Sequence, residues 1–222
     1  MSGLKVAIIG GRIDGQSGVV LDILKRISSV EIVCIFDHTP ELKGQSLNGV
    51  SVVGDFLEEY QNYLELFDAI HIAIGDNFSR GQYAKLTKQL GIPLYTLIHE
   101  HSVVSPSSRI GEGSFIGPGA IIQNNVEIGR ATIVNSGAIV EHDCKLGDAV
   151  HLAPRVTLAG RVNVGNEAFL GIGSSVIPDI FIGESSFVAA GSTVVKDVGI
   201  NDFVVGVPAR KKDNIYQTKR DV

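Results

Sequence analysis

Residues 104–140 read VSPSSRIGEGSFIGPGAIIQNNVEIGRATIVNSGAIV, and every sixth residue of this stretch is Val or Ile. The spacing continues without interruption to Val194, with Val, Ile or Leu at each step. Two residues before each step the side chain is small or β-branched. A repeat of this kind is typical of β-solenoids, in which stacked units bury one continuous core. The stretch therefore predicts a prism of parallel strands with three hexads in each coil.

The composition fits a narrow core and excludes several classes of protein. Of the 222 residues only 6% are aromatic and none is tryptophan, while 44% are apolar. A net charge of -5 gives no basic surface for nucleic acid. No signal peptide or membrane span is evident, so we expect a cytoplasmic protein. The two cysteines, Cys34 and Cys144, lack the spacing of a metal site, and we expect no metal.

The segment before the repeat alternates short β-branched runs with amphipathic stretches, which indicates a βαβ layout around a parallel sheet. The sequence predicts a Rossmann-like domain over residues 1–99 and a β-helix over residues 100–222 that ends in a basic tail. Strands are expected over 6–9, 31–36, 69–74 and 94–98, and helices over 18–27, 57–66 and 80–90.

Sheets of this kind bind ligands at the carboxyl ends of their strands. The candidate binding residues there are Gly10, Gly11, Arg12, Asp37, Gly75 and Asn77.

The glycine loop at residues 10–18 reads GGRIDGQSG and does not match G-x-G-x-x-G. Arg12 stands where a second glycine would let the backbone approach a pyrophosphate, so a nicotinamide cofactor is not expected. Two interpretations of the loop stay open. It either turns the chain from strand to helix, or it binds a nucleotide or sugar phosphate at the helix N-terminus.

One outward column of the repeat is apolar, which is unusual for an external surface of a soluble monomer. We expect a subunit interface there, although cover by the C-terminal tail is the alternative. The column contains Phe115, Ile133, His151, Phe169 and Phe187.

His142 lies in a turn of the repeat, and the residue one coil further on in its column is Gly160. The missing side chain at Gly160 predicts a gap beside the imidazole in which a ligand could lie. Asp143 could hold the ring in one tautomer. His151 belongs to a different face, so the two imidazoles should not meet within one chain but could meet across a subunit interface.

Three segments carry a resemblance to a known family: LIHEHSVVSPSSRIGEGSFIGPGAII at 97–122, IVEHDCKLGDAVHLAP at 139–154 and VVGVPAR at 204–210. The chain resembles the left-handed β-helix, hexapeptide-repeat acetyltransferases. Within them it is similar to the bacterial nucleotide-sugar N-acetyltransferases with a Rossmann-like N-terminal domain, of the bacillosamine and perosamine type, and to the related sialic acid O-acetyltransferases.

The resemblance implies a homotrimer with active sites at the subunit interfaces. It implies that His142 is the general base, oriented by Asp143, and that the N-terminal domain binds the nucleotide sugar. The basic tail is then either solvated or paired with the phosphates of coenzyme A. The resemblance places acetyl-CoA at His151, Gly160, Ile172 and Ala190, and the basic residues of the tail are Arg210, Lys211, Lys212, Lys219 and Arg220.

The implied function is acetyl transfer from acetyl-CoA to the amine of a nucleotide-activated amino-deoxy sugar, for bacterial surface glycan synthesis. Two alternatives stay open: O-acetylation of a sialic or other nonulosonic acid, and a non-catalytic protein that binds a sugar nucleotide. The glycine loop departs from the family pattern, because Arg12 and Asp14 lengthen it. This departure leaves the identity of the nucleotide open.

Overall fold

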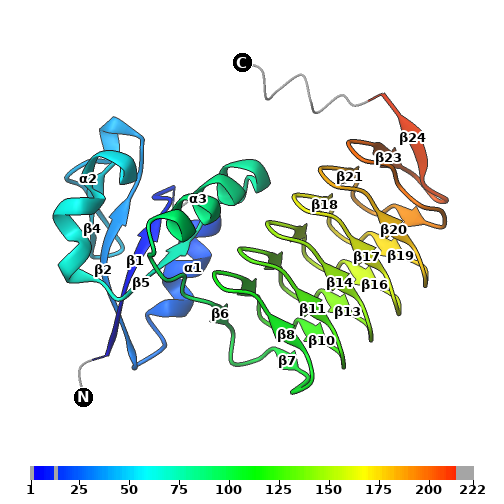
Figure 1. Cartoon of the computed structure of the whole chain (residues 1–222), viewed down its shortest axis with the longest axis horizontal. Helices are drawn as coiled ribbons and strands as arrows, with labels where there is room; N and C mark the ends of the chain where they lie inside the picture. Colours follow the sequence, from blue (N-terminus) through cyan, green and yellow to red (C-terminus); the bar gives the residue numbers. More distant parts are fainter. Residues whose placement is uncertain (1–2, 13–14, 214–222) are drawn as a thin grey trace. The chain divides into compact units, whose positions relative to one another are not determined.

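A computed structural model describes residues 3–12 and 15–213 of the chain. The chain divides into two compact units, Met1–Leu97 and Ile98–Val222, which are described separately below (Figure 1). Among the described residues, no helix is long and apolar enough to cross a membrane.

The first unit is a parallel sheet with helices between its strands. Its strand order is β3-β4-β2-β1-β5, and β1, β2, β4 and β5 run parallel while β3 pairs with β4 in the antiparallel sense. The strands are β1 (Leu4–Ile9), β2 (Val30–Phe36), β3 (Ser46–Leu47), β4 (Val50–Gly54) and β5 (Ala69–Ile72). The helices are α1 (Gln16–Leu24), α2 (Phe56–Tyr63) and α3 (Asn77–Gln89), with short 3-10 turns η1 (Pro40–Leu42) and η2 (Leu64–Leu66).

The expected strand over residues 94–98 is wrong. Only Leu94 forms a bridge to this sheet, with Ile70. Strand β6 (Leu97–Ile98) instead belongs to the sheet that contains β9 of the second unit. The backbone of Tyr95 still hydrogen-bonds to Ile70, and four residues later His99 donates to Ile116. One apolar run therefore serves two sheets, which periodicity alone does not reveal.

The second unit is a left-handed parallel β-helix, which confirms the predicted fold class. Three sheets form its faces, and their strands are two residues long except β23 and β24, which have three. One face contains β7 (Val103–Val104), β10 (Ile121–Ile122), β13 (Ile139–Val140), β16 (Thr157–Leu158), β19 (Ser175–Val176) and β22 (Thr193–Val194). The next contains β8 (Arg109–Ile110), β11 (Glu127–Ile128), β14 (Lys145–Leu146), β17 (Asn163–Val164) and β20 (Phe181–Ile182). The third contains β6, β9 (Phe115–Ile116), β12 (Ile133–Val134), β15 (His151–Leu152), β18 (Phe169–Leu170), β21 (Phe187–Val188), β23 (Phe203–Val205) and β24 (Arg210–Lys212).

Every aliphatic step of the hexad is the second residue of one of these strands, from β7 to β22. All of these side chains are buried except Val104 and Ile110, which lie in the first coil and are partly exposed. Together with the small residues two positions earlier, such as Ala138 and Cys144, they form one continuous core. The hexad thus produces both the strand spacing and the interior of the prism.

The turns between strands share one backbone conformation. In every turn from Gly113 to Gly191, the third residue after the strand has positive φ. This left-handed conformation costs a residue other than glycine roughly 1–2 kcal/mol, yet glycine fills only some of these positions. Asn or Asp, which tolerate it best, fills three others, and Asp143 is one of them with φ of 60°. The remaining positions hold Ala131, Ala149, Arg155, Arg161, Glu167 and Ser185.

The β-helix ends in a hairpin. Strand β23 adds to β21 in parallel, and β24 pairs with β23 in the antiparallel sense. Arg210, Lys211 and Lys212 of the basic tail form β24, whereas Lys219 and Arg220 lie outside the described residues.

Candidate active site

His142 and Asp143 form a hydrogen-bonded pair in the turn between β13 and β14. His142 Nδ1 lies 2.8 Å from Asp143 Oδ2. An ionised carboxylate can only accept, so Nδ1 carries the proton and Nε2 keeps a free lone pair. The His142 side chain is 42% exposed, which leaves it accessible to a ligand. This is the tautomer that a general base needs.

The left-handed turn brings Asp143 beside the imidazole. Its other carboxylate oxygen, Oδ1, accepts a hydrogen bond of 3.1 Å from Asn125 Nδ2, one coil earlier. The hydrogen bonds to His142 and Asn125 lower the pKa of Asp143, and the charge of Arg161 adds to the effect. Asp143 is therefore held as a carboxylate.

The expected gap beside Gly160 is filled by the His142 ring itself. A Cβ atom at Gly160 would lie 2.6 Å from both Cε1 and Nε2 of the imidazole, which is too close for any real contact. The glycine therefore makes room for the histidine rather than for a separate ligand.

His151 lies on β15, on a different face from the turn that holds His142. Its ring meets Phe169 edge-on at 5.1 Å between centroids, and Phe169 stacks on Phe187 at 4.7 Å. The apolar column is not uniform, because Phe115 and Ile133 are 1% and 2% exposed whereas the next three members are half-buried. The accessible part of the column is therefore the part that begins at His151.

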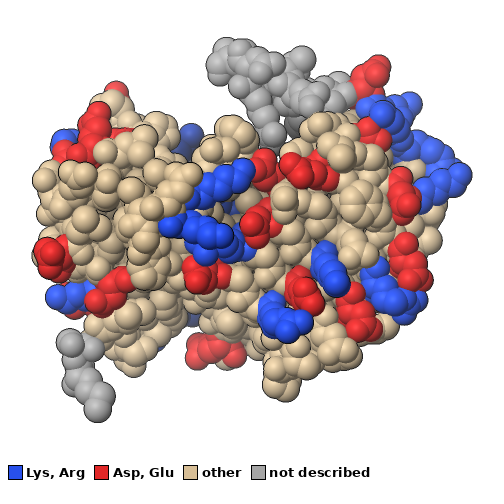
Figure 2. Space-filling model, in the orientation of Figure 1, with Lys and Arg blue, Asp and Glu red and all other residues tan. Residues whose placement is uncertain are grey.

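Two other residues expected near acetyl-CoA, Ile172 and Ala190, lie one coil apart and are exposed, Ile172 by 56%. Their backbones are joined through Gly191, whose amide donates to the Ile172 carbonyl. Figure 2 shows basic side chains gathered at the end of the β-helix that carries β24. Lys211 of this strand forms an ion pair with Asp202, at 2.6 Å between Nζ and Oδ1.

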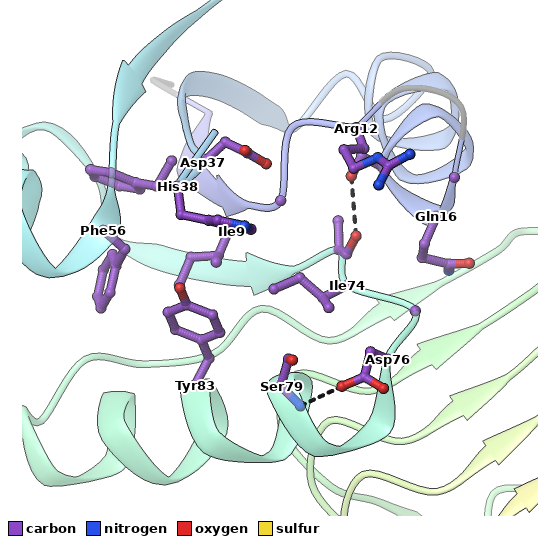
Figure 3. A pocket seen from close by; sticks show the side chains of 16 residues that line it. Ile9, Arg12, Gln16, Asp37, His38, Phe56, Ile74, Asp76, Ser79 and Tyr83 are labelled. Carbon is purple, nitrogen blue, oxygen red and sulfur yellow. Dashed lines mark hydrogen bonds between the residues drawn. The ribbon is translucent and has the colours of Figure 1, made fainter. Parts of the chain in front are cut away.

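A cavity of about 540 Å³ lies at the carboxyl ends of the strands in the first unit. Figure 3 shows residues of several segments around it: Arg12 in the glycine loop, Gln16 at the start of α1, Asp37 and His38 after β2, and Tyr83 on α3. Of the residues predicted for this site, Gly10, Arg12, Asp37 and Gly75 line the cavity, and Gly11 and Asn77 do not.

Asp37 and Gly11 organise the glycine loop. The Gly11 amide donates to Asp37 Oδ2, and the Thr39 amide donates to Oδ1 at 2.9 Å. Burial acts to raise the pKa of Asp37, but the hydrogen bonds from Thr39 and Gly11 outweigh it and lower the pKa. A Cβ atom at Gly11 would lie 3.0 Å from the Asp37 Cβ, and Gly10 has φ of 111°. Both glycines are thus required by the fold of the loop.

Asn77 is held away from the cavity by a buried arginine that sequence reasoning missed. Arg80 is 1% exposed and donates to the carbonyls of Ile74 and Gly75 at 3.0 and 2.9 Å. Its other terminal nitrogen donates to Asn77 Oδ1 at 2.9 Å, and Asn77 is 3% exposed. Asn77, which was predicted to bind the substrate, therefore supports the conformation of the loop instead.

Sequence reasoning also missed the aromatic side of the cavity. Phe56 and Tyr83 meet edge-on at 6.0 Å between ring centroids and line the cavity together. Burial, with the nearby charges of Asp55 and Asp37, raises the pKa of Tyr83, so its hydroxyl stays protonated. Tyr83 is on the inner side of a helix, where an aromatic residue normally signals only core packing.

Two family models match the chain, one in each unit. The PglD N-terminal domain matches residues 5–86, and the bacterial transferase hexapeptide model of six repeats matches residues 107–140. A search of curated proteins returned no match.

Solved structures are similar to the chain over nearly its whole length. PerB from Caulobacter crescentus, in complex with CoA and GDP-perosamine, is 40% identical, with a TM-score of 0.87 and coverage of 96% of this chain and 98% of PerB. A histidine-to-alanine mutant of the Caulobacter GDP-perosamine N-acetyltransferase, with the same two ligands, has a TM-score of 0.88 at 38% identity, with the same coverage of 96% and 98%. The acetyltransferase domain of PglB from Neisseria gonorrhoeae, in complex with acetyl coenzyme A, is 31% identical with a TM-score of 0.84, and the match covers 95% of this chain and 100% of that domain.

Proposed function

The chain belongs to the hexapeptide-repeat acetyltransferases with a PglD-type N-terminal domain, and from this we propose that it acetylates the amine of a nucleotide-activated amino-deoxy sugar with acetyl-CoA. The likeness to PerB, over 96% of the chain at 40% identity, carries the proposal. GDP-perosamine, present in the PerB structure, is the first acceptor to test.

We assign the general base to His142 Nε2. As the amine nitrogen attacks the thioester carbonyl carbon, a C–N bond forms and His142 accepts a proton from that nitrogen. A backbone N–H stabilises the oxyanion of the tetrahedral intermediate. When the C–S bond breaks, the imidazolium returns the proton to the departing thiolate. Acetyl-CoA supplies the activated acetyl group, and Asp143 keeps the imidazole oriented throughout.

Covalent catalysis by a cysteine does not fit the described chain. Cys144 is fully buried, and its Sγ donates to the Ala159 carbonyl at 3.1 Å. Burial raises the pKa of Cys144 to about 11 and that of Cys34 to about 12, so both are thiols rather than thiolates. Direct transfer from acetyl-CoA to the amine therefore suits this site.

The cavity of the first unit is proposed to hold the nucleotide. The N-terminus of α1, with Arg12 and Gln16 beside it, suits the diphosphate because free amides and a guanidinium both favour anions. The Tyr83 hydroxyl and Asp37 offer a donor and an acceptor to the nucleoside. Phe56 supplies an apolar wall.

A homotrimer is proposed from the half-buried aromatic residues that follow His151. Partner subunits would cover this surface, bring His151 towards the acetyl-CoA of an adjoining site and complete the pocket beside Ile172 and Ala190. Arg210 and Lys212 would then be available for the CoA phosphates. We place the reaction in the cytoplasm, where the free cysteines stay reduced.

The test is release of free thiol from acetyl-CoA in the presence of GDP-, UDP-, dTDP- and CMP-linked sugars. We expect turnover with an amino sugar and an N-acetylated product, and a loss of at least a hundredfold in kcat for His142→Ala. If the product is instead an O-acetylated nonulosonic acid, the acceptor is a hydroxyl group and not the proposed amine. Binding of a sugar nucleotide without thiol release from any acceptor would contradict the enzymatic function.

A further inference from the structure

A column of four polar residues runs along the edge of the β-helix that carries His142. Asn125, Asp143, Arg161 and Asp179 occupy the same left-handed position in successive turns, with φ of 57°, 60°, 61° and 65°. Pairing of successive coils aligns these turns, and the Arg161 amide donates to the His142 carbonyl at 3.0 Å. Each side chain thus has a neighbour from the coil before it and from the coil after it.

Arg161 lies between two carboxylates and pairs with only one of them. Its Nε and Nη2 atoms are 2.6 and 2.8 Å from the two oxygens of Asp179, in a bidentate arrangement. On its other side Asp143 uses Oδ2 for His142 and Oδ1 for Asn125. Arg161 is near enough for its charge to act on Asp143.

A guanidinium can donate two charge-assisted hydrogen bonds to a carboxylate, whereas a neutral imidazole donates only one, weaker hydrogen bond. If Asp179 did not hold Arg161, the guanidinium would be free to pair with Asp143 and displace Nδ1 of His142. The imidazole would then lose the acceptor that fixes its tautomer. The ion pair at Arg161 and Asp179 therefore bears on a base one coil away from the arginine.

We propose that Asp179 is a positioning residue for acetyl transfer, which holds Arg161 so that Asp143 stays bonded to His142. The inference rests on the proposed role of His142 as general base. Neither Asp179 nor Arg161 needs to touch a substrate in this arrangement.

The expected signature is a change in kcat and in its pH dependence. In Asp179→Asn, kcat should fall by about tenfold with little change in KM, since the general-base contribution is weakened and not abolished. The charged residues in the turns of this column are Glu141, Asp143, Arg161, Asp179, Lys196 and Asp197. In Asp179→Asn, Arg161 would pair with Asp143 and neutralise its charge, so Asp143 would stabilise the protonated His142 ring less. The acidic limb of the kcat profile should therefore move to lower pH.

The decisive experiment is a double-mutant cycle with Arg161→Gln. The double variant Arg161→Gln/Asp179→Asn should recover the kcat and pH profile of the Arg161→Gln single variant, because no guanidinium remains to compete. Asp179→Glu, which keeps a carboxylate, should stay close to the parent. Glu112→Gln is the matched control, because it breaks a comparable exposed pair with Arg130, at 2.7 Å between successive coils of another column.

Nitrogen-15 NMR of the histidine ring gives a readout besides turnover. His142 should carry its proton at Nδ1 in the parent and in the double variant, and lose this preference in Asp179→Asn. An unchanged profile in Asp179→Asn, or a double variant as impaired as the single one, would overturn the inference. Its failure can be distinguished from failure of the proposed function. The function fails if the parent releases no thiol with any acceptor, and the general-base role fails if His142→Ala retains turnover, whereas failure of this inference leaves both of those results as expected.

Discussion

At the scale of single residues, the site depends on where side chains are absent as much as on where they are present. Gly160 permits the His142 ring to lie against the next coil, and Gly11 permits its own amide to donate a hydrogen bond to Asp37. Both glycines stood out in the sequence, but the sequence does not say what fills the space that each one leaves. That depends on a rotamer at His142 and on a loop conformation at Asp37, which spacing does not determine.

Gly160→Ala should reduce turnover far more than stability. The new methyl group would meet the imidazole at 2.6 Å, and the half-exposed ring can move whereas the coil cannot. We expect kcat to fall by about tenfold or more through misplacement of the base, with a small change in melting temperature. Adding Gly160→Ala to His142→Ala should cause no further loss, and a further loss would show that the methyl group acts elsewhere.

Asp37 should stabilise the first unit in a pH-dependent way. Its pKa is lowered in the folded chain, so its stabilisation is present above the unfolded pKa of about 3.9 and disappears as the pH falls through the lower, folded value. Asp37→Asn should lower the melting temperature at pH 7 and differ less from the parent near pH 3. Thermal unfolding at both values measures this, and a constant difference would refute the role of the charge.

At the scale of elements, predictability followed the number of times a pattern is repeated. The hexad predicted the β-helix because each coil repeats the same burial, as at Val140 and Leu158. The prediction lacks strands β3 and β4, which form an antiparallel hairpin of two and five residues inside a domain expected to contain parallel strands only. The helices were found but shifted at their starts; α3 begins at Asn77 because Asp76 caps it through the Ser79 amide at 2.8 Å, a signal that periodicity ignores.

Glycines at one corner of the β-helix should be required for stability. A Cβ at Gly129 would lie 2.5 Å from the Gly147 carbonyl carbon, so Gly129→Ala must push two coils apart. We expect a loss of roughly 1–3 kcal/mol, as for overpacking in a core. Gly75→Ala in the first unit is the control, because its Cβ would meet nothing within 4 Å and its backbone does not have positive φ. Equal losses in thermal unfolding would refute the steric explanation.

At the scale of the whole molecule, the proposed trimer depends on the aromatic column rather than on general surface hydrophobicity. Phe169→Glu should yield monomers in light scattering at micromolar concentration and lower kcat/KM for acetyl-CoA. Phe181→Glu changes an equally large ring on the neighbouring face, where Phe181 is 48% exposed, and should leave the assembly intact. A trimer that survives Phe169→Glu would place the subunit interface elsewhere.

Because all coils have the same hexad pattern, the chain can fold with a changed number of hexads even where the positions of its functional residues change. Inserting one extra hexad between His142 and His151 would keep every aliphatic position filled, so the prism should still form. It would nevertheless advance His151 and Phe169 by one face relative to Phe115, whereas three hexads would restore the phase. Insertions of single hexads are therefore compatible with stability. Only insertions of three hexads, a whole coil, also keep each functional residue on its own face.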